Sequence, residues 1–271
     1  HLAILELLEI PRAVVALTKR DLVEPDYLDL VVAEVEELLS HGRYAGSRIV
    51  PVSAVTGAGL DDLRQTLDVA LDATPPKRDL GRPRLPIDRA FTIQGFGTVV
   101  TGTLLDGSLQ VGQEVEIQPG RLRARIRGLQ RHRTKVDTLE PGTRAAVNLS
   151  GIHADELQRG MVLALPGRLA PVTALDVRLH ATSLLSHPLG HDSGLTALSS
   201  TAEAEARLRL LDCDELLPGD DGWAQLVLES PVAVLPGDHV VLRTPNETVA
   251  GGVIAAVNPR RHRRHHVPTL D

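Results

Sequence analysis

The chain has 271 residues, 42% of them apolar, and a formal net charge of −6. This length suffices for two or three domains with sizeable cores. A single cysteine, Cys213, excludes a disulfide framework, and no apolar run approaches the roughly 18 residues of a membrane span. We therefore expect a cytoplasmic protein without membrane contact. With one Trp, two Tyr and two Phe, aromatic stacking platforms for single-stranded nucleic acid are not expected.

The charge is unevenly divided along the chain. Residues 1–74 carry a net charge of −7, residues 75–168 carry +6 and residues 169–271 carry −5. A basic segment between two acidic ones predicts an anionic partner for the middle segment, with an incidental swing as the alternative.

The first 74 residues alternate between strand and helix patterns. The opening HLAILELLEI reads as a helix already under way, so the chain appears cut at its start. Apolar runs at 12–17 and 48–52 predict buried parallel strands, and amphipathic periodicity predicts helices at 25–41 and 60–71. Strand, helix, strand, helix predicts an α/β fold.

Each predicted strand is followed by a motif suited to reading a guanine base. Thr18-Lys19-Arg20-Asp21 follows the first strand, and Ser53-Ala54-Val55 follows the second. Carboxyl ends of parallel strands are where open α/β sheets bind ligands. Asp21 can accept the two N–H donors of guanine, Lys19 can lay its methylene stem across the base, and backbone N–H groups at Ser53-Ala54 can meet the carbonyl oxygen. The pair resembles the fourth and fifth motifs of GTP-binding proteins, with Thr18 where most have Asn. We assign nucleotide binding to Thr18, Lys19, Asp21, Ser53, Ala54 and Val55.

A break at Thr74-Pro75-Pro76-Lys77-Arg78 predicts a domain boundary, because successive prolines cannot continue a helix. Beyond it, short runs with a period of two, punctuated by Gly and Pro-Gly, predict two all-β bodies of sandwich or barrel type. The expected domains are 1–74, 75–168 and 169–258, followed by a basic tail or linker at 259–271.

A run of alternating arginines lies in the middle segment. Arg121, Arg123, Arg125 and Arg127 alternate with Leu122, Ala124 and Ile126, so one face of the predicted strand is cationic. Repulsion between like charges slightly favours an anionic partner over a merely solvated face. In the tail, His262, His265 and His266 lack a cysteine or carboxylate cluster beside them, so no metal site is predicted.

The order of these parts resembles that of translational GTPases of the elongation-factor class. The block LPIDRAFTIQGFGTVVTGT at 85–103, with RIRGLQ at 125–130, PGTRAAVNL at 141–149, GDHVVLR at 237–243 and VAGG at 249–252, is similar to the selenocysteine-specific elongation factors. The resemblance implies the back of a P-loop GTPase G domain followed by two elongation-factor barrels, II and III. It also implies GTP or GDP with Mg²⁺ as ligands, and delivery of selenocysteyl-tRNA to the ribosome at recoded UGA codons.

A carrier of this kind must reject the same tRNA bearing serine. A selenol is more acidic than a thiol, whose pKa is about 8.5, so the correct side chain is largely anionic at neutral pH. We assign its recognition to Arg89 and Arg144 in a partly dry pocket, with Asp88 orienting Arg89 and balancing its charge. An Asp-Arg pair that only closes a barrel corner is the alternative. RNA contacts are assigned to Arg121, Arg123, Arg125, Arg127 and Arg243.

The sequence also departs from that class. It contains no Gly-x-x-x-x-Gly-Lys-Ser/Thr and no Asp-x-x-Gly, so the phosphate cradle and the magnesium ligands are missing. We therefore expect this segment alone to be catalytically inactive and to bind nucleotide weakly, as a monomer, with contact to an mRNA hairpin left to a missing C-terminal domain. A general aminoacyl-tRNA carrier or related translational GTPase, and a non-catalytic β-barrel module that binds RNA or protein, are the rival interpretations.

Overall fold

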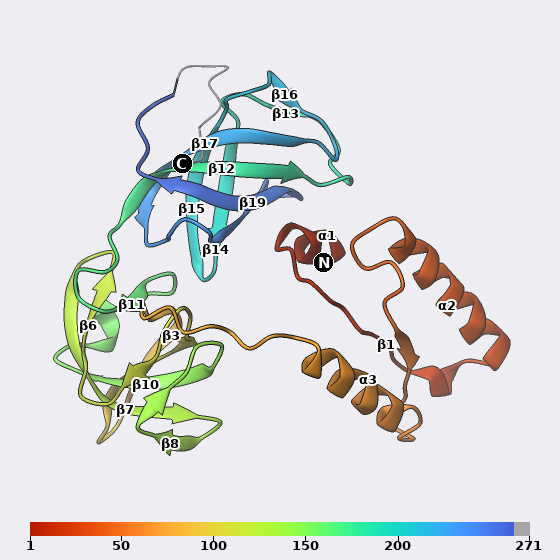
Figure 1. Ribbon diagram of the computed structural model, residues 1–271, viewed down its shortest axis with the longest axis horizontal. Helices are drawn as coiled ribbons and strands as arrows, with labels where there is room; N and C mark the ends of the chain where they lie inside the picture. The colour runs from red at the N-terminus through yellow and green to blue at the C-terminus, as the bar shows by residue number, and fades with distance from the viewer. Residues whose placement is uncertain (263–271) are drawn as a thin grey trace. The chain divides into compact units, whose positions relative to one another are not determined.

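A computed structural model describes residues 1–262 of the chain (Figure 1). The chain divides into two compact units: Ile4–Pro76 together with Leu2, and Lys77 onward together with His1 and Ala3. Residues 263–271, most of the predicted basic tail, lie outside the described residues.

The first unit contains two short strands, with helices before, between and after them. Its elements are α1 (Leu2–Leu7), β1 (Val15–Leu17), the 3₁₀ turn η1 (Arg20–Leu22), α2 (Pro25–Ser40), β2 (Ile49–Pro51) and α3 (Leu60–Asp72). Pro25 occupies the first turn of α2, where its missing N–H costs nothing. Strands β1 and β2 pair in parallel, as predicted.

The expectation that both strands are buried is wrong for β1. Ala16 is exposed, and Val15 and Leu17 are only half-buried. The reason is that this sheet has two strands in the described part of the chain, so one edge and part of each face of β1 stay uncovered.

The second unit begins with a barrel whose strands run in the order β10-β4-β3-β11-β6-β7, closed by pairing of β7 with β10, with β8 attached to β7. The predicted alternation of β7 is confirmed: Ala124 and Ile126 are buried, and the arginines between them are exposed. Elements of this barrel are β3 (Arg84–Ile93), β4 (Gly97–Thr103), β5 (Leu109–Gln110), β6 (Glu114–Gln118), β7 (Leu122–Arg131), β8 (Thr134–Val136), β9 (Thr138–Leu139), β10 (Arg144–Ser150), η2 (Ala154–Glu156) and β11 (Val162–Ala164).

A second closed barrel follows, with strand order β12-β17-β15-β14-β18-β19. Strand β15 shows why it forms: in AEAEARLRL every second residue is buried, so one face packs inward. Elements of this barrel are β12 (Val172–Ala181), β13 (Leu189–Gly190), β14 (Gly194–Ser199), β15 (Ala202–Leu210), β16 (Glu215–Leu216), β17 (Asp221–Val232), β18 (His239–Arg243) and β19 (Thr248–Val257). The prediction of two β-barrels is thus confirmed.

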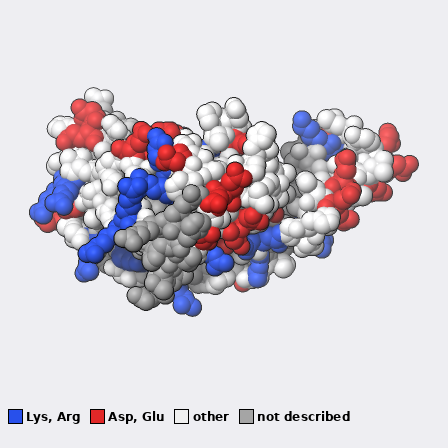
Figure 2. Space-filling model, turned by 90° about the horizontal axis from the view of Figure 1, so that it is seen from above, with Lys and Arg blue, Asp and Glu red and all other residues white. Residues whose placement is uncertain are grey.

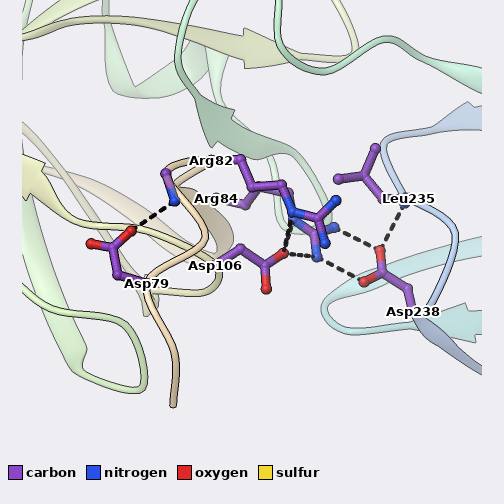
Figure 3. Close-up of polar contacts among 7 residues, drawn as sticks. Asp79, Arg82, Arg84, Asp106, Leu235 and Asp238 are labelled. Carbon is purple, nitrogen blue, oxygen red and sulfur yellow. Dashed lines mark hydrogen bonds and ion pairs between the residues drawn. The ribbon is translucent and has the colours of Figure 1, made fainter.

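A buried ion-pair cluster joins the two barrels within the second unit (Figure 3). Arg84, at the start of β3, is 7% exposed and donates to Asp106 of the first barrel, at 2.9 and 2.5 Å, and to Asp238 of the second, at 2.6 and 2.8 Å. Asp238 also accepts from the Leu235 N–H at 2.8 Å. Burial opposes the charge of Arg84, but the two carboxylates outweigh it and raise its pKa. A small apolar cluster that includes Val162 and Ala233 packs the same two barrels together.

In the view of Figure 2, acidic and basic side chains are intermingled on the surface, and neither kind covers it as one large patch. Among the described residues, no helix is long and apolar enough to cross a membrane.

Candidate functional site

The two predicted guanine motifs lie side by side in the structure. Parallel pairing places Leu17 opposite Pro51, and the Val52 N–H donates to the Leu17 carbonyl at 2.8 Å. Beyond the strands, the Arg20 N–H donates to the Val52 carbonyl at 3.2 Å. The loops at 18–21 and 53–55 therefore leave the same edge of the sheet next to each other.

In the second loop, hydrogen bonds select which groups are available to a ligand. Ser53 is fully buried, its N–H donates to the Ala58 carbonyl at 2.9 Å, and its Oγ accepts from the N–H groups of Val55 and Thr56 at 3.2 and 3.1 Å. Within the described chain, the exposed Ala54 N–H makes no hydrogen bond. The Ser53 hydroxyl and the Val55 N–H therefore stabilise the loop itself. Of the three residues predicted to bind nucleotide in this loop, Ala54 is the one whose N–H is available to a ligand.

The first loop presents its polar groups to solvent. Lys19 adopts a left-handed backbone conformation with φ of 65°, which turns the chain into η1, where Asp21 lies. Thr18, Lys19 and Asp21 are all exposed. Among the described residues the Asp21 carboxylate makes no ion pair or hydrogen bond, so its acceptor oxygens are available to N–H donors.

In the first barrel, Asp88 sits in a β-bulge. Ile87 pairs with Gly102 and Arg89 with Thr101, so Asp88 is the extra residue of β3. Its carboxylate accepts from the Thr101 hydroxyl at 2.5 Å and forms an ion pair with Arg144 at 2.6 Å. Burial opposes ionisation, but the hydroxyl and the guanidinium outweigh it and hold the pKa of Asp88 below its usual value.

Two expectations for this site need correction. Asp88 contacts Arg144 directly, whereas Arg89 acts on it only through its charge, because the bulge turns the Asp88 side chain toward the neighbouring strands. The arginines are also not in a partly dry pocket: Arg89 is exposed, and the Arg144 side chain is 63% exposed, since both lie on the outer face of the barrel. Asp88 and Arg89 on β3 and Arg144 on β10 nevertheless lie on the two strands that flank β4.

The arginine run largely follows its predicted arrangement. Arg123, Arg125 and Arg127 lie on the outer face of β7, and Arg121 precedes the strand in a turn with φ of 56°. Arg125 pairs with Glu114 of β6 at 3.1 Å. Asn148 pairs with Gly128 and Leu149 with Ile126, so Arg127 is the bulged residue. The remaining predicted RNA contact, Arg243, is exposed at the end of β18 in the second barrel.

Neither the tail histidines nor the hollow in the first unit adds to these sites. His262 contacts the buried Asp176 at 2.6 Å, while His265 and His266 lie outside the described residues. A hollow of about 540 Å³ is lined by residues that include Arg12, Arg48 and Asp62, at the amino ends of β1 and β2. It therefore lies at the opposite end of these strands from the guanine motifs.

Comparison with known proteins shows what the chain is similar to. A family model described as "Elongation factor Tu domain 2" matches residues 97–164, and "Selenocysteine-specific elongation factor, beta-barrel domain" matches residues 175–261. The curated selenocysteine-specific elongation factors of Desulfomicrobium baculatum and Escherichia coli (strain K12) are 43% identical over 98% of this chain and 32% identical over 96% of it. Over nearly its whole length, the chain is similar to selenocysteine-specific elongation factors.

Solved structures give the same fold for the chain. Elongation factor SelB from Methanococcus maripaludis, in complex with the GTP analogue GppNHp, matches with a TM-score of 0.86 at 23% identity, over 96% of this chain and 62% of that one. A bacterial selenocysteine-specific factor, EF-Sec, matches with a TM-score of 0.82 at 24% identity, over 93% of this chain and 41% of that one. The chain spans 42% and 41% of the length of the two curated relatives.

Two features of the first barrel were not predicted from the sequence. Thr101 completes the Asp88 site, and a two-residue turn places His132 and Arg133 at the tip of the β7–β8 hairpin. The contact of Thr101 with Asp88 depends on the register between β3 and β4, which cannot be read from the sequence. The hairpin has a visible signal, since Arg131-His-Arg-Thr-Lys135 carries four cationic or titratable side chains in five residues.

Proposed function

We propose that the protein to which this chain belongs is a GTP-dependent carrier that delivers selenocysteyl-tRNA to the ribosome at recoded UGA codons. In this proposal residues 1–74 are the base-binding half of a P-loop GTPase domain, 75–168 hold the aminoacyl end of the tRNA, and 169–258 form a supporting barrel. GTP or GDP binds with Mg²⁺, whose ligands lie outside the motifs that this chain carries.

The guanine pocket is supported by what the two adjacent loops leave available. The Asp21 carboxylate offers acceptors for the N–H donors of guanine, and the Ala54 N–H offers a donor for its carbonyl oxygen. Adenine presents the reverse pattern at that carbonyl position, so it would leave the Ala54 donor unpaired. The loops thus favour guanine over adenine.

The single observation that carries the amino-acid specificity is the Asp88 cluster. Asp88 holds Arg144 at 2.6 Å, and Arg89 projects from the next position of the same strand. Two guanidinium groups with one carboxylate leave a net positive charge, which attracts a selenolate and gains little from a neutral hydroxyl. Because Arg144 faces solvent, each arginine contributes about 1 kcal/mol or less to this discrimination.

Binding of tRNA charged with selenocysteine or with serine tests the proposal. Replacing Arg89→Ala or Arg144→Ala should each reduce the preference for selenocysteyl-tRNA roughly 2- to 5-fold, mainly by weakening the selenocysteyl form. Arg207→Ala is the matched control, because Arg207 is similarly exposed and ion-paired, to Asp192 at 3.4 Å, but lies in the second barrel.

Three outcomes would contradict the proposal. If the variants lose affinity equally for selenocysteyl- and seryl-tRNA, the arginines do not recognise the selenolate. Equal affinity of the unmodified protein for selenocysteyl- and cysteinyl-tRNA would favour a general aminoacyl-tRNA carrier. If the affinity for tRNA does not depend on the aminoacyl end, a module that binds RNA only through phosphates is favoured.

A further inference from the structure

The tip of the β7–β8 hairpin is a concentrated cationic surface. Arg131 pairs with Thr134 across the turn, and Lys135 pairs with Gln130. Arg131, His132, Arg133 and Lys135 are all exposed, and within the described residues no ion pair joins any of them to a carboxylate. Arg125, on the same strand, is by contrast already paired with Glu114. The hairpin tip therefore keeps its positive charge uncompensated.

The backbone at the tip is held in an unfavourable conformation for these residues. His132 has φ of 48° and Arg133 has φ of 67°. A two-residue hairpin turn with positive φ at both positions strongly prefers Asn and Gly. Packing does not explain His and Arg here, because both side chains are exposed. His132 and Arg133 adopt a costly backbone conformation and make no contact with the core. This combination favours a role in binding.

The tip lies beside the Asp88 cluster. Arg131 pairs with Ala145 in the antiparallel β7–β10 ladder, so Arg144, one residue earlier in β10, is level with His132. Adjacent strands lie about 4.8 Å apart. Arg144 in turn pairs in register with Thr103 and holds Asp88. A ligand that contacts Arg144 is therefore one strand away from the hairpin tip, whereas Asp88 lies on β3, beyond β10 and β4.

We infer that Arg131, Arg133 and Lys135 bind the phosphodiester backbone at the acceptor end of the tRNA, next to the terminal nucleotide that carries the amino acid. This inference rests on the proposed function, because that function places the aminoacyl group at Asp88 and Arg144. Phosphates suit the tip better than a protein surface does, since charged residues are depleted at the centres of protein interfaces and the tip presents Arg131, Arg133 and Lys135 together in the exposed turn. Lys135 lies 6.0 Å above the Phe96 ring, which limits its freedom and aims its ammonium group.

The test replaces Arg131, Arg133 and Lys135 together by Gln and measures tRNA affinity against salt. Each phosphate contact on a single strand contributes about 0.7 to the slope of log K against log salt, so the slope should fall by about 2. Affinity at low salt should fall at least tenfold, equally for selenocysteyl- and seryl-tRNA. A control that replaces Arg64, Arg168 and Arg207 by Gln removes the same charge from exposed sites elsewhere and should leave both values unchanged.

A second variant separates binding from folding. Arg133→Gly relieves the positive φ, so its melting temperature should be at least that of the unmodified protein. The inference requires that its tRNA affinity nevertheless falls. An affinity that stays the same or rises would show that the turn is only structural, and would overturn the inference.

The remaining outcomes are also decisive. If the triple variant keeps its tRNA affinity and salt slope but binds ribosomes more weakly, the phosphates belong to ribosomal RNA and the inference is wrong. If the triple variant keeps its affinity while the unmodified protein still prefers selenocysteyl-tRNA, this inference fails and the proposed function stands. If the unmodified protein shows no such preference, the proposed function fails independently of the hairpin.

Discussion

At the scale of single residues, Asp88 shows how one inserted position changes a site. Without the bulge, residue 88 would alternate between faces like its neighbours; with it, the carboxylate lies within reach of both Thr101 and Arg144. The carboxylate is 14% exposed whereas its arginine partner is 63% exposed. The pair therefore has one fixed member and one that can turn toward a ligand.

The lowered pKa of Asp88 makes its contribution to stability depend on pH. A carboxyl group with a lowered folded-state pKa stabilises the fold above its unfolded pKa of about 3.9, and this contribution is lost as pH falls through the folded-state value. Asp88→Asn should therefore lower the free energy of unfolding by about 1 kcal/mol at pH 7, and by less and less below pH 4. Thermal unfolding of both proteins between pH 2 and 7 measures this. A deficit that persists undiminished at pH 2 would show that the loss is not due to charge.

At the scale of elements, the loop from β2 to α3 depends on a close backbone approach. Gly59 precedes α3 with φ of 77°, and a Cβ atom there would lie 2.2 Å from the Pro51 carbonyl oxygen. Gly57 has φ of 80° but open space around its Cβ position. The two glycines thus share a left-handed conformation, but only at Gly59 would an added Cβ atom collide with the neighbouring backbone.

This difference predicts unequal costs for one substitution. Gly57→Ala should destabilise the first unit by about 1 kcal/mol, through the left-handed conformation alone. Gly59→Ala should cost roughly 2–4 kcal/mol, because the loop must also move away from β2. Hydrogen exchange of the amides of β2 and α3 reports on this unit specifically. Equal effects of the two substitutions would mean that the loop adjusts freely.

The elements that repeat a period over many residues could be predicted from the sequence, and short or irregular ones could not. Strand β15 alternates over nine residues, whereas β11 has only three and is held by neighbours distant in sequence. The guanine motifs remain a prediction that rests on residue types, whereas the role of the Ser53 hydroxyl depends on loop geometry. The partner of Asp88 was predicted wrongly because a one-residue bulge leaves no periodic mark in β3.

At the scale of the whole molecule, Arg84 couples the two barrels through charge. Its guanidinium is 8% exposed, so removing it takes away the buried counter-ion that Asp106 and Asp238 share and leaves Asp106 only its longer ion pair with Arg82, at 3.9 Å. We expect Arg84→Met to lower the free energy of unfolding by about 3–5 kcal/mol and to separate one melting transition of the barrels into two. Calorimetry measures both effects.

A triple substitution provides the control for that prediction. Arg84→Met combined with Asp106→Asn and Asp238→Asn removes the buried charges altogether, so much of the lost stability should return. A single transition at an unchanged temperature in Arg84→Met alone would show that apolar contacts such as those of Val162 and Ala233 suffice to hold the barrels together.

The same ion pair has a consequence for biosynthesis. Arg84 and Asp238 are 154 positions apart, and Asp238 belongs to the turn just before the last two strands of the second barrel. During translation the first barrel is therefore complete, with Arg84 held only by Asp106, long before its second partner emerges. Joining of the barrels therefore follows completion of the first barrel, and a nascent chain stalled before Asp238 leaves the Arg84–Asp106 pair uncovered by the second barrel.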